Sequence, residues 1–290
     1  MKFAEWLCEN NFIGTFAFGQ SVRIAAVSAA SYGLWHEKFG LRQARAKSRG
    51  RYSLESESLA WSAALAGKRA GDRGQLESFA ERIEDLRKAL GGDAFDAPIH
   101  SFSHFVTGVG IAHPVENGFA WHRTCGVPYL PGSGVKGATL AYASDWADDP
   151  AGNKQEAIER IFGLGQLEQR RFQVNAESPG GATPNPGTAG SVIFLDALPL
   201  EPPMLGAQVL TPHGEGSGAP DDAGKTNPIG FLAVTTGLFR FVVLPRRVPN
   251  VDLVTAQKDS RQAMQWLRCA LSETGVGAKT KSGYGRFVPR

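Results

Sequence analysis

Glycine is concentrated in four segments of this 290-residue chain, and these clusters constrain its fold more than any other feature. Glycine accounts for 35 of the 290 residues, about 12%, where about 7% is usual. The excess gathers around residues 108–137, 163–190, 206–237 and 274–285. Glycine adopts backbone conformations that other residues avoid. We therefore expect a folded domain with long loops that are built by the backbone itself.

The rest of the composition is that of an ordinary folded protein. Hydrophobic residues make up 42% and charged residues 20%, which excludes disordered, collagen-like and coiled-coil classes. The cysteines Cys8, Cys125 and Cys269 are too far apart for a disulfide framework or a short-spaced zinc site, which favours a reducing compartment. Without a run of about 18 apolar residues or an apolar leader, the sequence predicts a cytoplasmic protein with no membrane partner.

Charge is segregated along the chain, although the net charge is only +3. Residues 148–239 hold 5 basic and 11 acidic side chains, whereas residues 240–290 hold 10 basic and 3 acidic ones. A second basic block, from Lys38 to Arg51, contains no acid. Such segregation is typical of proteins that follow a phosphate backbone or dock onto a charged neighbour, and also of an ordinary solvated surface.

Residues 1–98 predict a helical N-terminal region packed on the rest of the chain. Apolar residues at helical spacing indicate one helix around residues 54–65 and another after Asp72, which is a suitable N-cap. Gly91 ends the second pattern.

From residue 99 the pattern indicates a mixed domain. The expected elements are a strand at 99–110, a helix capped by Ser133, a short helix near 156–163, strands at 191–200 and 230–245, a helix at 254–275 and a last strand at 284–289. A Pro/Gly-rich insertion lies at about 147–190. This order predicts an α+β fold with a ferredoxin-like (RRM-like, βαββαβ) core over residues 99–290.

Residues 275–287, GVGAKTKSGYGRF, combine glycines with lysines, hydroxyls and an aromatic residue. Glycine lets backbone N–H groups approach phosphate oxygens, lysine adds positive charge, and Tyr284 can stack on a base. The segment is not a mononucleotide P-loop, because it follows a helix and enters a strand. The alternative is purely structural: a helix C-cap followed by a hairpin-like bend.

Residues 126–137, GVPYLPGSGVKG, lead into a helix whose first turn carries Ser133 and Lys136. The unpaired N–H groups and the positive end of the helix dipole attract phosphates there, and Lys136 adds to the field. A capped helix with an exposed lysine is the structural alternative.

Together the two segments resemble the RAMP superfamily of CRISPR systems. Within it, Thr211-Pro212-His213, followed by Asn227-Pro228-Ile229 and Phe231, is most similar to a subunit of the type III-B (Cmr) effector complexes. The resemblance covers residues 99–290. It implies a non-catalytic structural subunit that binds the guide (crRNA) RNA toward its 3′ end, caps the backbone filament, contacts other Cmr-type effector subunits and meets target RNA through the complex.

The resemblance also assigns site residues. Those expected to bind RNA are Gly132, Ser133, Gly134, Lys136, Gly277, Lys279, Thr280, Lys281, Ser282, Tyr284 and Arg286. His213 and Asn227 are expected to touch RNA or a neighbouring subunit. No cofactor, metal or catalytic residue is expected.

Two features of the sequence bear on catalysis. Cleaving backbone subunits of the family carry an aspartate in the loop after the first strand, where this chain offers Glu116. Histidine is an acid/base group in guide-processing relatives, but His100, His104, His113, His122 and His213 show no paired base at a readable spacing. An endoribonuclease that processes guide precursor, and a protein–protein adaptor without RNA contact, remain the alternative functions.

Overall fold

The computed structural model describes seven segments: residues 32–37, 62–113, 116–150, 152–163, 189–210, 229–249 and 251–290. The helices are α4 (Arg73–Leu90), α5 (Gly132–Asp145), α6 (Lys154–Phe162) and α8 (Leu253–Cys269), with shorter helical turns η2 (Ala270–Thr274) and η3 (Thr280–Ser282). The strands of the main sheet are β1 (Asp93–Pro98), β6 (Val192–Phe194), β7 (Leu198–Pro199) and β10 (Leu238–Pro245). Paired strands outside it are β2 (Ala112–His113) with β3 (Glu116–Asn117), β4 (Trp121–His122) with β5 (Val127–Pro128), and β8 (Met204–Leu210) with β9 (Ile229–Thr236).

The main sheet is antiparallel, and β10 is its central strand. β10 pairs with β1 on one side and with β6 and β7 on the other. Beyond β1, a single antiparallel bridge joins Ile99 to Phe287. The predicted α+β class is therefore confirmed by a mixture of helices and antiparallel sheet.

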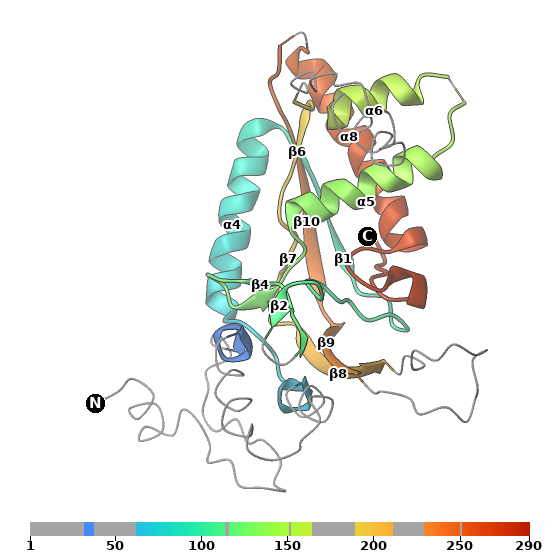
Figure 1. Ribbon diagram of the computed structural model, residues 1–290. Helices are drawn as coiled ribbons and strands as arrows, with labels where there is room; N and C mark the ends of the chain where they lie inside the picture. Colours follow the sequence, from blue (N-terminus) through green and yellow to red (C-terminus); the bar gives the residue numbers. More distant parts are fainter. Residues whose placement is uncertain are drawn as a thin grey trace, which may run out of the picture.

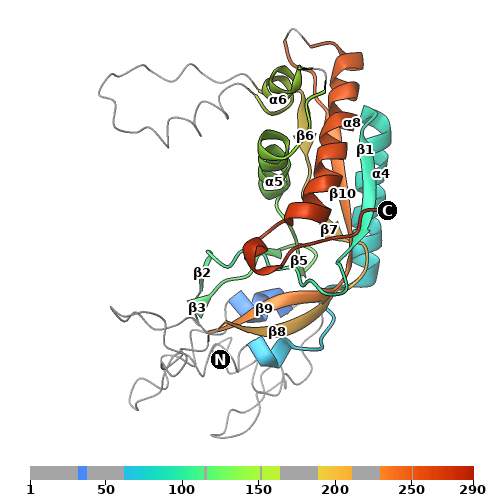
Figure 2. The same cartoon turned by 90° about the vertical axis from the view of Figure 1, so that its right-hand side faces the viewer.

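Helices cover both faces of this sheet. α4 lies on one face, and α5 and α8 lie together on the other (Figures 1 and 2). Along β10, Phe239, Phe241 and Val243 belong to the core beneath α8, whereas Arg240 and Val242 face α4. This double coverage explains why β10 reads as a nearly continuous apolar run rather than an alternating one.

The β8–β9 ribbon lies at the opposite end of the molecule from α6 (Figure 1). Its strands pair from Met204↔Thr236 to Leu210↔Ile229. The connection between them, residues 211–228, lies outside the described residues.

Capping confirms some helix boundaries predicted from sequence and corrects one. Asp72 caps α4 by accepting a hydrogen bond from Gln75 N at 2.9 Å, and Gly91 ends the helix with φ of 69°. The predicted cap at Ser133 is wrong, because α5 begins at Gly132 and Pro131 is its N-cap residue. Asp196 supplies the missing side-chain acceptor, at 2.6 Å from Gly132 N.

The predicted first strand at 99–110 is also wrong. The strand is β1, just before it, and the segment 99–110 contributes only isolated bridges at Ile99 and Phe105. The two acidic residues of β1, Asp93 and Asp96, are unfavourable for strand in a sequence-based prediction, so β1 was not predicted. In the fold, Asp96 is directly opposite Arg240, whose guanidinium donates to both carboxylate oxygens at 2.8 and 3.0 Å.

Two further strand predictions need correction. Residues 191–200 form two short strands, β6 and β7, and between them Asp196 accepts a hydrogen bond from Gly132 N at the start of α5. The expected last strand at 284–289 is reduced to the single bridge at Phe287.

Much of the predicted helical N-terminal region lies outside the described residues. Within them, residues 32–37 and 62–65 are helical. The proposed division into residues 1–98 and 99–290 stays a prediction, as does the insertion at 147–190, in which α6 is described. In the part of the chain that the structure describes, no helix is long and apolar enough to cross a bilayer.

Candidate nucleic-acid interface

The glycine-rich segment after α8 folds as a compact loop with several left-handed residues. Gly275, Gly277, Gly283 and Gly285 have φ between 78° and 87°. A Cβ on Gly285 would lie 1.9 Å from Val276 O, and one on Gly277 would lie 2.3 Å from Val106 O. These two glycines are therefore required by the packing of the loop itself, whereas a Cβ on Gly283 would meet only open space.

The segment 103–106 holds this loop in place through four hydrogen bonds. Ala278 N donates to Val106 O at 2.7 Å, and Gly285 N donates to His104 O at 2.8 Å. Ser103 Oγ donates to Gly283 O at 2.8 Å and accepts from Arg286 N at 3.1 Å. The loop is thus fixed before any ligand arrives, which lowers the entropic cost of binding.

Tyr284 connects the loop to the β8–β9 ribbon. Its hydroxyl donates to Gln208 Oε1 at 3.1 Å, and its ring makes edge contacts with Phe231 and His104. Burial raises the pKa of Tyr284. The ring expected to stack on a base is therefore half-buried and in contact with two other rings.

The basic residues of the loop differ in exposure. Lys279 is half-buried, and its Nζ lies 4.9 Å from the centre of the Phe231 ring. Thr280 is half-buried as well. Lys281, Ser282 and Arg286 are exposed. The loop thus presents two exposed cations to solvent on a rigid backbone.

Two groups at the start of α5 that were expected to bind RNA make hydrogen bonds within the fold. Gly132 N donates to Asp196, and Lys136 Nζ donates to Phe162 O at the end of α6, at 2.9 Å. Burial, and secondarily the nearby Arg246, lowers the pKa of Lys136. Ser133 is exposed, and Gly134 is partly covered by Leu130.

Gly137, at the end of this first stretch of α5, was not among the predicted site residues. A Cβ at this position would meet no atom within 4 Å. Glycine in a helix interior costs roughly 0.5–1 kcal/mol relative to alanine, and packing within the chain does not require it here. In the sequence, Gly137 is the last residue of the glycine-rich segment 126–137.

The two glycine segments contact adjacent residues of the chain, since Thr107 Oγ1 donates to Tyr129 O at 3.0 Å and Val106 O accepts from Ala278 N, but their expected phosphate-binding parts have different partners. The first turn of α5 contacts Asp196 and Phe162, whereas the C-terminal loop contacts residues 103–106 and the β8–β9 ribbon. No hydrogen bond between the described residues links them. His213 and Asn227 lie outside the described residues.

The described histidines are dispersed. The rings of His36 and His113 stack with centroids 4.4 Å apart, and burial lowers the pKa of both. Burial also lowers the pKa of His122, which contacts Phe79 and Tyr129. His100 and His104 have different neighbours, with the His100 ring beside Phe102 and the His104 ring beside Tyr284. Across the described segments, no three His, Cys, Asp or Glu side chains form a group that could hold a metal ion.

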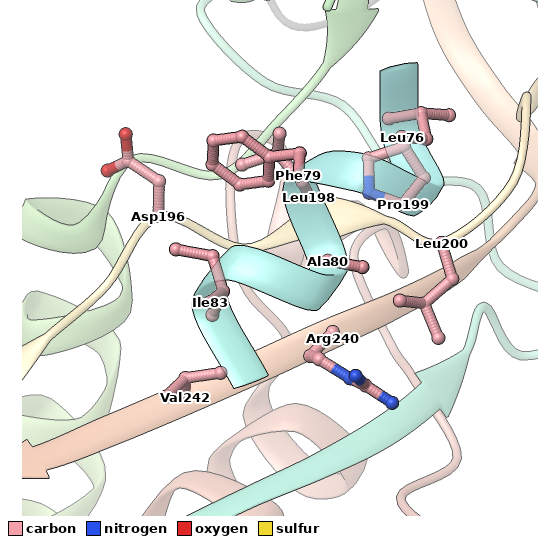
Figure 3. Close-up of a pocket in the computed structure, with 10 residues that line it drawn as sticks. All are labelled: Leu76, Phe79, Ala80, Ile83, Asp196, Leu198, Pro199, Leu200, Arg240 and Val242. Atoms are coloured by element: carbon pink, nitrogen blue, oxygen red, sulfur yellow. The ribbon is translucent and has the colours of Figure 1, made fainter. Parts of the chain in front are cut away.

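A small cavity lies between α4 and the sheet (Figure 3). Its volume is about 20 Å³, and its lining is mostly apolar, with Leu76, Phe79 and Ile83 from α4 facing Leu198 and Val242. Asp196 and Arg240 stand at its edges (Figure 3). This space holds about one water molecule, far less than a ligand pocket of 300–1,000 Å³.

Comparison with known proteins gives a consistent result. The family model described as the RAMP superfamily matches residues 98–288. The CRISPR system Cmr subunit Cmr6 of Pyrococcus furiosus is 28% identical over 229 residues, covering 64% of this chain. The match spans 65% of that relative's own length.

One solved structure agrees with this chain at the level of fold. A chain of the type III-B Cmr-beta complex, described as bound to cognate target RNA, matches 81% of this chain and 71% of its own length. The TM-score is 0.56 and the identity 18%. The crystal structure of Cmr6 from Pyrococcus furiosus is 25% identical, covers 69% of this chain and 99% of its own length, and has a TM-score of 0.35.

Proposed function

Because the chain belongs to the RAMP superfamily, we propose that it is a non-catalytic, RNA-binding structural subunit of a type III-B CRISPR (Cmr) ribonucleoprotein. It binds guide RNA toward the 3′ end of the guide and caps the backbone filament. Its other partners are Cmr-type subunits, and it meets target RNA through the complex. The similarity to Cmr6 supports this assignment.

The observation that carries the proposal is the rigid glycine loop with exposed cations. Lys281 and Arg286 project from a loop that four hydrogen bonds fix to residues 103–106. Cations on a pre-formed backbone suit a phosphate chain, which needs charge and position but no base-specific contact. The loop lies within the segment that matches the family.

A ferredoxin-like core is part of the proposal. The strand order supports it: the Phe287 bridge, then β1, β10 and β6, all antiparallel. The two helices that follow β1 and β10, α5 and α8, cover the same face of this sheet (Figure 2). That is the arrangement expected of two βαβ units that interleave in one sheet.

The absence of catalysis rests on Glu116 and on the histidines. Glu116 lies in β3, opposite His113. His36 and His113 are buried, or partly so, among aromatic rings, an environment that stabilises neutral packing groups. We predict that a reconstituted complex carrying Glu116→Ala cuts target RNA at its usual sites. Loss of one specific cut, with assembly intact, would instead assign catalysis to this subunit.

One assay separates the three candidate functions. The full chain is mixed with labelled repeat-containing RNA in the presence of a metal chelator, and both retention on a filter and cleavage are recorded. Retention without cleavage supports the RNA-binding subunit. Cleavage indicates a guide-processing endoribonuclease, and neither retention nor cleavage indicates a protein–protein adaptor.

A further inference from the structure

Phe102 is the most exposed large hydrophobic side chain in the described part of the chain. It is 93% exposed, and the next, Trp146, is 66% exposed. Full burial of a phenylalanine side chain stabilises a protein by roughly 1.5–3 kcal/mol, and Phe102 contributes almost none of this to the fold. Single exposed apolar residues are common on protein surfaces, so the setting of Phe102 decides what it means.

The backbone around Phe102 is fixed. Phe102 N donates to His100 Nδ1 at 3.2 Å, and Ser103 N donates to His100 O at 2.9 Å. Ser103 Oγ in turn donates to Gly283 O and accepts from Arg286 N. The ring therefore stands on a tight turn that is tied to the glycine loop.

The neighbours of Phe102 are polar and basic. Ile99 and Phe287 form a bridge and are both buried, so the adjacent pair, His100 and Arg286, points away from the core. His100 N donates to Arg286 O at 2.9 Å, which makes the two residues cross-strand neighbours. The His100 ring lies 5.9 Å from the Phe102 ring, tilted by 45°.

We propose that Phe102 is a base-stacking residue, whose ring receives one unpaired nucleobase of a single-stranded RNA held by the glycine loop. The inference rests on the proposed function and adds a contact to a base, which the phosphate-binding loop does not provide. An aromatic face stacks on any base, and neighbouring cations hold the adjacent phosphates.

Tyr284 is less suited to this role. Its hydroxyl is bonded to Gln208, and its ring contacts Phe231 and His104. Phe102, on the neighbouring turn, offers an exposed ring to a ligand. Charge favours RNA over a protein partner as the occupant, because Arg286 is exposed beside His100 and Lys281 is exposed on the same loop.

The test compares Phe102→Ala, Phe102→Leu and Phe102→Trp in the full chain, with a fluorescent single-stranded 20-mer of uridine as the probe. Loss of one stacked base is worth roughly a tenfold loss of affinity, so Ala should bind about tenfold more weakly. Leu keeps an apolar side chain but lacks an aromatic face, and it should behave like Ala. Trp should bind at least as tightly as Phe.

Two further readouts isolate stacking from charge and from folding. The slope of log K against log salt should stay unchanged in all three variants, because no phosphate contact is removed. Binding of inorganic polyphosphate, which has charge but no bases, should also stay unchanged. The midpoint of thermal unfolding should not move, because the side chain is exposed.

The outcomes separate this inference from the proposed function. If Lys281→Ala and Arg286→Ala weaken RNA binding while Phe102→Ala does not, the stacking role is wrong and the RNA-binding loop stands. Equal losses for RNA and polyphosphate would also overturn stacking. If Phe102→Ala blocks incorporation into the complex but leaves RNA affinity unchanged, Phe102 is a protein contact. A wild-type chain that does not bind RNA refutes both proposals.

Discussion

Lys279 has a left-handed backbone, with φ of 59°, and no other non-glycine residue in the described segments has a positive φ. For a residue with a Cβ this conformation costs about 1–2 kcal/mol. The ammonium group lies over the Phe231 ring, and this cation–π contact offsets part of the conformational cost. The conformation and the charge of Lys279 can therefore be tested separately.

We predict that Lys279→Gly and Lys279→Ala weaken RNA binding equally but differ in stability. Both lose the ammonium and its contact with Phe231, but only glycine adopts the left-handed conformation without strain. The free energy of unfolding in urea should be about 1 kcal/mol higher for Lys279→Gly than for Lys279→Ala. If Lys279→Gly binds RNA like the wild type, the charge of Lys279 does not contribute to RNA binding.

Gly137 allows a test in which stability and binding move in opposite directions. Gly137→Ala should stabilise the chain by about 0.5–1 kcal/mol, because the space around this helical position is open. If RNA passes close to this turn of α5, the added methyl group should weaken binding. Gly74→Ala in α4 is the matched control, since its Cβ would make an ordinary 3.4 Å contact with Asp72 Oδ1. Unchanged RNA affinity in Gly137→Ala would remove this turn from the RNA path.

The site residues differ in how far the sequence predicted them. The glycine motifs identified the superfamily, and the match to residues 98–288 confirms it. Gly277 and Gly285 are explained by close packing onto the chain itself, which motif chemistry does not reveal. Phe102 gave no sequence signal, because its exposure depends on how the turn at residues 100–103 is tied to the distant residues Gly283 and Arg286.

Among the elements, those with strong periodicity were predicted well. α4 and α8 have regular apolar spacing and side-chain caps at Asp72 and Asp252, so local sequence determines them. β1 was missed because its acids are compensated by residues distant in sequence. Arg240 binds Asp96, and Ser260 Oγ donates to Asp93 Oδ2 at 2.7 Å. A local sequence pattern does not predict partners that are distant in the sequence.

An ion pair connects α6 to α8, and Ser191, just before β6, binds the same carboxylate. The guanidinium of Arg160 donates to both carboxylate oxygens of Asp259, at 2.7–3.1 Å, and Ser191 Oγ donates to the same carboxylate at 2.6 Å. The Asp259 side chain is 3% exposed and that of Arg160 is 30% exposed. Water can therefore solvate an unpaired Arg160 better than an unpaired Asp259.

We predict that Arg160→Ala destabilises the chain at least as much as Asp259→Ala, with a loss of about 3 kcal/mol. The reason is that Arg160→Ala leaves a buried carboxylate with only Ser191 as a side-chain donor. Urea unfolding measures both variants, and Glu156→Ala, which removes an exposed partner of Arg160, is the control with an effect below about 1 kcal/mol. A larger loss for Asp259→Ala would contradict this ordering.

The helix at residues 32–37 contributes a pH-dependent contact. His36 is buried, and burial, with His113 as a lesser cause, lowers its pKa to about 3. Trp121 Nε1 donates to His36 Nδ1 at 3.4 Å, which requires the neutral ring. In the unfolded chain the pKa of histidine is about 6.5, so unfolding takes up a proton at any pH between the two values.

Stability should therefore fall as the pH is lowered from about 6.5 toward 3. Between pH 7 and pH 5 the contribution of His36 amounts to about 2 kcal/mol. His36→Gln keeps a hydrogen-bond acceptor but does not titrate, so the difference in unfolding free energy between pH 7 and pH 5 should be smaller by this amount. An identical pH dependence in the wild type and in His36→Gln would show that the pKa of His36 is the same in the folded and unfolded states.

On the scale of the whole molecule, the basic C-terminal stretch is mostly available to a partner. Arg240 is bound to Asp96, but Arg246, Arg247, Lys258 and Arg261 are exposed, as are Lys281 and Arg286 of the loop. We predict that the acidic stretch 148–239 and the basic stretch 240–290 occupy different surfaces of the fold, although many of these acids lie outside the described residues. An exposed basic surface steers a polyanion toward the protein and makes binding depend on salt.

The salt dependence of RNA binding tests the central claim most directly. The full chain is titrated with a single-stranded RNA from low to high salt, alongside a variant with Lys279, Lys281 and Arg286 changed to alanine. Lys136 is left unchanged because its ammonium already binds Phe162 O. A second variant, with the exposed Lys68, Arg82 and Lys88 changed to alanine, carries the same change in net charge and leaves the basic C-terminal stretch intact.

With a slope of about −0.7 per neutralised phosphate of a single strand, the loop variant should flatten log K against log salt by about 2. The control variant should change it much less, since its cations lie outside the loop. Equal slopes in the wild type and the loop variant, or equal flattening in the two variants, would contradict the assignment of the glycine loop as the RNA-binding surface.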